Sequence, residues 1–352
     1  MAAGSLSDFI SMVDGYIEQG ATDGLPVVPP SVERAEAMIA ASGRDADEAV
    51  GLLPPTYEEA AVRDVAVNAT MAGCLPEYMP VVLAAVEVML ESSFHLDHLA
   101  TSTKGNAPLV VVNGPIRQRI VLNCGKNVLG PGTRANATIG RAIRLLLINV
   151  GNSVPGVTDH SCFGHAGKYT YTVGEDEEGS PWEPLHVSSG YSPEDSTVTV
   201  MGSEAPRYVS AVASPKYPEV ALTRIADVMS TLASFGMTGR SEAFVLLGPD
   251  HRAAVAEAGW SKSDVRDFLY ERAGRPAVDL EAGQPPGRAD SLPHLRERDG
   301  YQPDDWVPLF GSADDVTIVA AGGAGIVSMV CYGSPSLEYG RHGQRQIQAR
   351  AP

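Results

Sequence analysis

A stretch of ten residues, 159–168 (DHSCFGHAGK), places acidic, basic and cationic side chains close together in the chain. Asp159, His165 and Lys168 could transfer protons, with the imidazole as general base and the ammonium group stabilising developing negative charge. Glu175 opens a run of four acidic residues and could orient one of these groups. The segment therefore predicts acid–base catalysis, and a loop fixed by its own hydrogen bonds is the structural alternative.

The same stretch offers a different set of ligand atoms. His160, Cys162 and His165 could bind a metal ion, although their spacing matches no standard zinc motif. Acid–base catalysis without a metal is the interpretation we prefer, and the sequence indicates no particular cofactor.

Cys74 is a candidate nucleophile or redox thiol. It lies in MAGCLPEYMPVV, where Gly73 ends one expected helix and Pro76 suits the first turn of the next. A thiol at a helix N-terminus has a lowered pKa, which favours the thiolate. The alternative is a small buried residue at a helix junction.

A glycine-rich loop, residues 130–141 (GPGTRANATIGR), opens an expected buried helix. Free backbone amides at a helix start, with arginines nearby, can hold a carboxylate or phosphate. A tight turn into a core helix, with the arginines in ordinary ion pairs, is the structural alternative. The candidate substrate-binding residues are Gly132, Thr133, Arg134, Asn136 and Arg141, together with Trp182 as an aromatic wall between two prolines. We expect this helix start and the His165–Lys168 segment to share one pocket.

The elements that must position these groups follow from periodicity and from proline and glycine. Residues 5–19 have one apolar face, whereas residues 76–91 are apolar nearly all round and predict a buried helix. We expect further helices over 56–72, 135–150, 218–235, 251–258 and 261–273, strands over 108–113, 196–201, 207–213, 243–247 and 316–321, and a long surface loop over 274–305.

This pattern predicts an α/β or α+β fold, with a mixed sheet and a largely helical N-terminal third. We place a weak domain boundary between a helical N-terminal part with the polar segment, 1–213, and a smaller α/β part, 214–352. A single domain is the alternative, because 352 residues suit one large domain or two ordinary ones.

The net charge of −17 argues against nucleic acid and anionic membranes, both of which need a basic surface. Local arginine and lysine side chains still permit an anionic substrate. The four cysteines are widely spaced, so a disulfide scaffold is not expected. The N-terminus lacks the pattern of a signal peptide, and a cytoplasmic protein is the default expectation.

Several blocks, including DGLPVVPPS, MAGCLPEYMPVV, GPGTRANATIGRA and GHAGKYTYTVGEDEEGSPWEPLH, resemble a poorly characterised bacterial family with no settled activity. Its members occur beside, or fused with, UGSC-type (seleno)proteins, which are named for a Sec/Cys-Gly-Ser-Cys motif. The resemblance implies a link to thiol or selenol redox chemistry. This chain has no Gly-Ser-Cys tripeptide, so the thiol would come from Cys74 or from a thiol or selenol protein partner.

The sequence thus favours a homo-oligomeric cytoplasmic enzyme, an oxidoreductase or a lyase, that acts on a small anionic metabolite. Thiol-linked redox or nucleophilic chemistry at Cys74 is the first hypothesis. The alternatives are a lyase or hydrolase using acid–base catalysis, and a non-catalytic subunit of a thiol or selenol enzyme complex.

Overall fold

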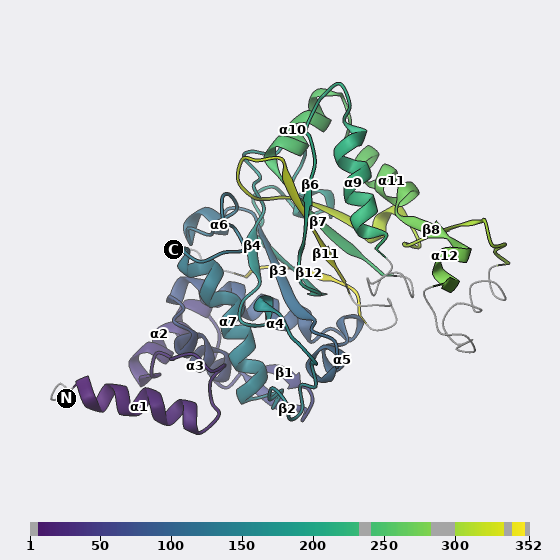
Figure 1. Ribbon diagram of the computed structural model, residues 1–352. Helices are drawn as coiled ribbons and strands as arrows, with labels where there is room; N and C mark the ends of the chain where they lie inside the picture. The colour runs from purple at the N-terminus through teal and green to yellow at the C-terminus, as the bar shows by residue number, and fades with distance from the viewer. Residues whose placement is uncertain (1–5, 232–240, 283–299, 334–339, 349–352) are drawn as a thin grey trace.

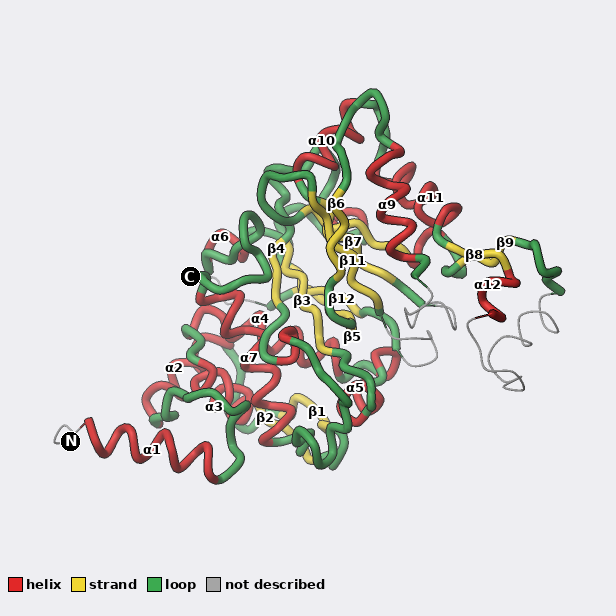
Figure 2. The backbone as a smooth tube through the Cα atoms, viewed as in Figure 1, coloured by secondary structure: helices red, strands yellow, loops and turns green. Residues whose placement is uncertain are grey.

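The computed structural model describes residues 6–231, 241–282, 300–333 and 340–348, and contains two four-stranded mixed sheets (Figures 1 and 2). The first sheet has the order β12-β5-β3-β4 and the second β10-β7-β11-β6. The strands of the first are β3 (Ala107–Asn113), β4 (Thr172–Gly174), β5 (Thr197–Ser203) and β12 (Gly343–Gln346); those of the second are β6 (Arg207–Ser210), β7 (Ala243–Leu247), β10 (Val316–Ala320) and β11 (Val327–Tyr332).

Helices cover the outer face of each sheet. The first sheet is associated with α2 (Val32–Ser42), α3 (Val62–Ala72), α4 (Met79–Met89), α5 (Leu96–Thr101), α6 (Ile116–Arg119) and α7 (Arg134–Asn149), and with the hairpin β1 (Ala49–Leu53) and β2 (Glu58–Ala61). The second is associated with α9 (Glu219–Met229), α10 (Pro249–Glu257), α11 (Lys262–Arg272), α12 (Ala277–Ala282), β8 (Gly274–Pro276) and β9 (Trp306–Pro308), whereas Leu185 of the short α8 (Leu185–Ser188) packs against the layer between the sheets.

Side chains of β3 and β7 point alternately to the two faces of their sheets, and both faces are buried, which explains the apolar runs in these two strands. In β3, Val110 and Val112 face the helices while Leu109 and Val111 face the second sheet. In β7, Phe244 points into the layer between the sheets, and its neighbours pack under the outer helices. Successive side chains of a strand point to opposite faces, so burial of both faces requires an unbroken apolar run. The molecule is therefore layered as helices, sheet, sheet, helices.

The α/β or α+β fold class is confirmed. The helix expected over 56–72 begins only at Val62, because residues 58–61 form β2. The loop expected over 274–305 contains β8 and α12, and its residues 283–299 lie outside the described residues, as do residues 232–235 of another expected helix.

Each of the two sheets contains strands from both sides of the domain boundary expected at 213/214. Strand β6 precedes that point but pairs with β11 of the second sheet, and β12 follows it but pairs with β5 of the first. The division into two domains stays a prediction.

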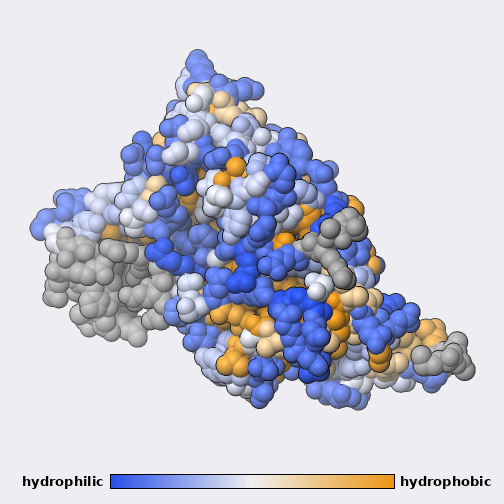
Figure 3. Space-filling view, turned by 180° about the vertical axis from the view of Figure 1, so that it is seen from behind, coloured by the Kyte–Doolittle hydropathy of each residue, from blue (hydrophilic) through white to orange (hydrophobic). Residues whose placement is uncertain are grey.

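Helix α1 (Leu6–Glu18) has the expected apolar spacing, yet it projects from the body (Figure 1). Val13 is its one buried side chain, whereas Leu6, Phe9, Ile10 and Ile17 are exposed. The face seen from behind is mainly hydrophilic, in keeping with the charge of the chain, and apolar residues gather in its lower half (Figure 3).

Close packing at Gly140 in the middle of α7 positions the polar segment. A Cβ atom there would lie 2.6 Å from Thr170 Oγ1 and 2.7 Å from the backbone nitrogen of Tyr171. Only glycine permits this approach. The chain leading into β4 therefore lies directly on α7, and the 159–168 segment is held beside the second half of that helix.

Candidate functional site

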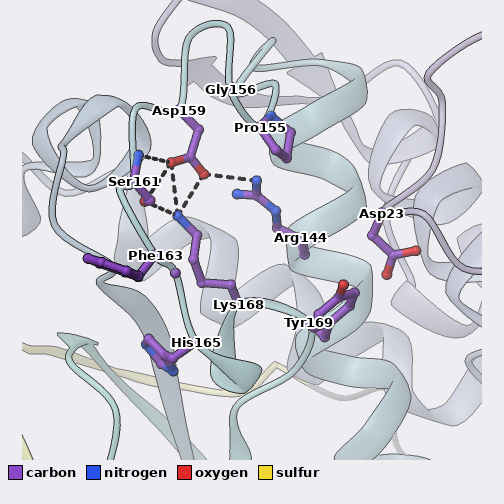
Figure 4. A pocket seen from close by; sticks show the side chains of 11 residues that line it. Asp23, Arg144, Pro155, Gly156, Asp159, Ser161, Phe163, His165, Lys168 and Tyr169 are labelled. Atoms are coloured by element: carbon purple, nitrogen blue, oxygen red, sulfur yellow. Dashed lines mark hydrogen bonds and ion pairs between the residues drawn. The ribbon is translucent and has the colours of Figure 1, made fainter.

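A cavity of about 330 Å³ opens between the second half of α7 and the loop that follows it (Figure 4). Its lining residues are Asp23, Arg144, Pro155, Gly156, Asp159, Ser161, Phe163, Gly164, His165, Lys168 and Tyr169. The polar segment of the sequence therefore does line a cavity.

Asp159 is the centre of the charged floor of this cavity. Its carboxylate is 2 % exposed and accepts from Lys168 Nζ at 2.9 Å (Oδ1) and 2.7 Å (Oδ2), and from Arg144 Nη2 at 3.0 Å (Oδ2). Its backbone nitrogen donates to Val154 O at 3.0 Å, which closes a tight turn. Hydrogen bonds from Lys168 and Ser161 outweigh the opposing effect of burial and lower the pKa of Asp159. The side chain is therefore ionised and holds two cations in place.

Lys168 connects this carboxylate to Ser161. Lys168 Nζ donates a hydrogen bond to Ser161 Oγ. The hydroxyl proton of Ser161 has two possible acceptors, Asp159 Oδ1 at 2.7 Å and the carbonyl oxygen of Lys104 at 2.9 Å. Burial is the main cause that lowers the pKa of Lys168, Arg144 lowers it further, and Asp159 opposes both. A partly buried lysine with a lowered pKa and a hydroxyl partner is a common arrangement for proton transfer.

The charges around the cavity do not balance. Arg144 and Lys168 share Asp159, and Arg141 pairs with both oxygens of Asp23 at 2.8 Å each. Two cations thus share the single carboxylate of Asp159, whereas Arg141, which does not line the cavity, neutralises the lining carboxylate of Asp23. An excess of one positive charge at this partly buried cluster favours an anionic ligand.

His165 lines the cavity wall but turns away from Asp159 (Figure 4). Its Nδ1 accepts from Gly167 N at 3.0 Å, and its ring lies edge-on to Tyr171. Burial is the main cause that lowers its pKa, and the nearby Lys168 adds to this, against the raising effect of the Ser203 and Gly105 backbone. The ring is therefore neutral at pH 7, and its contacts are those of a wall residue rather than of a base facing the ligand.

The start of α7 does not reach this cavity, contrary to the expectation of a shared pocket. Arg134 Nε donates to Gly73 O at 2.8 Å, and Arg141 approaches the cavity only through Asp23. Asn136 is buried and bonds the backbone of Asn123 and Thr172. Thr133 is the N-cap but makes no side-chain capping bond, and neither it nor Gly132 lines the cavity. Arg141 makes an ion pair of the kind that the structural alternative expects, whereas Arg134 bonds a backbone carbonyl.

Glu175 and Trp182 also lie elsewhere. Glu175 is fully buried and accepts from Asn113 Nδ2 at 2.5 Å and from Leu185 N at 2.7 Å. Asn113 is the last residue of β3, whereas His165 lies beside Gly105, just before the first residue of that strand. A strand of seven residues is about 20 Å long, so Glu175 and His165 lie near opposite ends of β3. Trp182 donates to Trp260 O and packs on the core of the second sheet. Glu175 therefore cannot orient His165 or Lys168.

Cys74 is 5 % exposed, and its Sγ lies 3.3 Å from Thr138 O. The lowered thiol pKa expected from its position is wrong, because burial raises the pKa of Cys74 to about 12. The thiol packs against α7 and does not line the cavity.

We expect Cys74 to resist alkylation in the folded protein. At a pKa of about 12 it carries about 1,000 times less thiolate at neutral pH than a thiol at the ordinary 9.0. Brief treatment with iodoacetamide followed by peptide mass spectrometry should label the exposed Cys162 and leave Cys74 unmodified until the chain is unfolded. Labelling of Cys74 as fast as Cys162 would contradict this account.

Two residues of the cluster around Asp159, Arg144 and Ser161, were not among the candidates from the sequence. Arg144 lies within the apolar run IRLLLI, and a charged residue inside an apolar helix is a recognisable sign of a buried ion pair. Ser161 carries no such sign, because it becomes notable only when Lys168 meets it in space.

The described parts of the chain hold no group of three or more His, Cys, Asp or Glu side chains that could bind a metal ion, so His160, Cys162 and His165 do not form one there. No described helix is long and apolar enough to span a membrane. No family model matches the chain, and no curated protein matches it. The resemblance to the family associated with UGSC-type proteins stays an interpretation of the sequence.

Proposed function

We propose that this protein is an enzyme of the lyase or hydrolase type that binds a small organic anion in the cavity beside α7. The observation that supports this most strongly is the partly buried Lys168, bonded to both oxygens of Asp159 and to Ser161 beside a second cation, Arg144. Cytoplasmic location and homo-oligomeric assembly remain part of the proposal.

The proposed roles follow from the contacts. Arg144 and Lys168 supply the charge that holds the anion, and Asp159 fixes the direction of both cations. Lys168 holds the anion as an ammonium and donates a proton to the substrate, since its lowered pKa favours release of that proton, and a proton from water then restores the ammonium form. Ser161 supplies a hydroxyl beside that nitrogen and completes the proton path.

The raised pKa of Cys74 and its place in the core give the thiol-linked hypothesis no support from geometry. The acid–base hypothesis keeps Asp159 and Lys168 from the original candidates, with Arg144 and Ser161 added. His165 becomes part of the wall.

The test is a calorimetric screen of small carboxylates and phosphates, each paired with its uncharged amide or alcohol. We expect an anion to bind at least about tenfold more tightly than its neutral partner, because only the anion compensates the buried positive charge. Bound anions are then incubated with the protein, and turnover is followed by NMR. Equal binding of the anion and its amide, or no binding up to about 10 mM, would overturn the proposal.

A further inference from the structure

The mouth of the cavity differs in chemistry from its floor. The floor is charged, but Pro155, Phe163 and Tyr169 line the upper walls. Phe163 is 101 % exposed and Tyr169 is 48 % exposed. Single exposed apolar residues are ordinary on protein surfaces, but these two line one cavity and flank the Lys168 side chain (Figure 4).

The backbone that carries Phe163 is held on both sides. Cys162 N donates to Thr103 O at 2.9 Å, and Ser161 bonds the Lys104 carbonyl and Asp159. On the other side, Gly164 has φ of +62° and lies so close to Gly105 that a Cβ on Gly105 would be 3.2 Å from Gly164 Cα. The ring is thus presented to solvent from a fixed backbone, which lowers the entropy lost when a ligand packs on it.

Charge and volume narrow the choice of ligand. An excess of one positive charge matches a monocarboxylate better than a doubly charged phosphate. An apolar protein cavity of roughly 150 Å³ can hold a benzene ring. About 330 Å³ therefore has room for a ring together with its carboxylate.

We propose that the cavity selects a monocarboxylate with an aromatic or similarly bulky apolar body. The carboxylate lies at Lys168 and Arg144, and the apolar body packs against Phe163 and Tyr169. This inference rests on the proposed anion site and adds the class of ligand, with Phe163 as a specificity-determining residue.

The test compares acetate, phenylacetate and phenylacetamide by calorimetry on wild type, Phe163→Ala and Val157→Ala. Val157 is the matched control, because it is 66 % exposed on the same loop but does not line the cavity. We expect wild type to bind phenylacetate at least about tenfold more tightly than acetate, in line with burial of a ring. Phe163→Ala should remove most of that preference, leave acetate binding within about twofold, and be rescued by Phe163→Trp. Val157→Ala should behave as wild type.

The outcomes separate the inference from the proposed function. If acetate and phenylacetate bind equally, or if Phe163→Ala leaves the preference intact, the apolar part is overturned while the anion site stands. If phenylacetamide binds as tightly as phenylacetate, or neither binds, both fail. If Phe163→Ala changes the oligomeric state by sedimentation and leaves all affinities unchanged, Phe163 belongs to a contact between copies and the inference is overturned.

Discussion

Asp159→Asn should destabilise the fold by about 3–5 kcal/mol, among the largest effects expected of a single substitution in this chain. The variant keeps the size of the side chain but leaves the buried Arg144 and the partly buried Lys168 beside each other without a counter-charge. Urea unfolding monitored by circular dichroism measures the change in the free energy of unfolding.

Asp47→Asn is the matched control, because Asp47 pairs with Arg63 at an exposed site. Its expected change is at most about 1 kcal/mol. If Asp159→Asn were too unstable to purify, the double variant Asp159→Asn, Lys168→Met should recover part of the loss by removing one uncompensated cation. Equal stability of Asp159→Asn and Asp47→Asn would show that the cluster is not a buried ion network.

The free energy of unfolding of the wild type should fall in strong acid, as Asp159 becomes protonated. Asp159 has a lowered pKa in the folded protein, so its contribution is complete above the ordinary value of 3.8. That contribution is lost only as the pH falls through the lower, folded-state pKa. The same cluster thus predicts the large effect of Asp159→Asn at neutral pH and persistence of the ion pairs in mild acid.

Lys168→Met should weaken binding of the anion by about 100-fold and reduce any turnover by about 10²–10⁴-fold. The substitution removes the cation closest to Ser161 and the group proposed to donate a proton. Titration calorimetry and progress curves measure the two effects. Lys216→Met, on an exposed lysine outside the cavity, should change neither.

The conservative variant separates charge from proton transfer. Lys168→Arg keeps the positive charge and should retain binding within about tenfold, while turnover stays low because a guanidinium does not lose its proton. Wild-type binding should weaken as the pH rises through a pKa below 10.5, and Lys168→Arg should abolish that dependence. Retention of full turnover by Lys168→Met would exclude Lys168 as the proton donor.

Much of the fold could be predicted from patterns along the chain. The all-apolar runs of β3 and β7 and the apolar helix α4 required burial on all sides, and they form the layers of the structure. The helix predicted over 56–72 was wrong for residues 58–61, because these residues pair with β1, and this contact overrides their local helix propensity.

The site was only partly predictable. The density of titratable groups in residues 159–168 indicated the correct segment, and Asp159 and Lys168 do meet. The helix start was a poor guide because every helix start offers amides, and here Arg134 and Arg141 satisfy backbone carbonyls and Asp23 instead. Arg144 meets Asp159 in space, and Gly140 lets residues 170–172 lie against α7; linear order reveals neither contact.

The most direct test is the titration of Lys168 Nζ by ¹⁵N NMR of lysine side chains, with and without the tightest-binding carboxylate, and with assignment by Lys168→Arg. We predict that the free protein shows a lysine with a pKa below 10.5 and that the carboxylate raises this pKa, since bound negative charge favours the ammonium form. A Lys168 signal that titrates at 10.5 and does not respond to any bound anion would contradict the account.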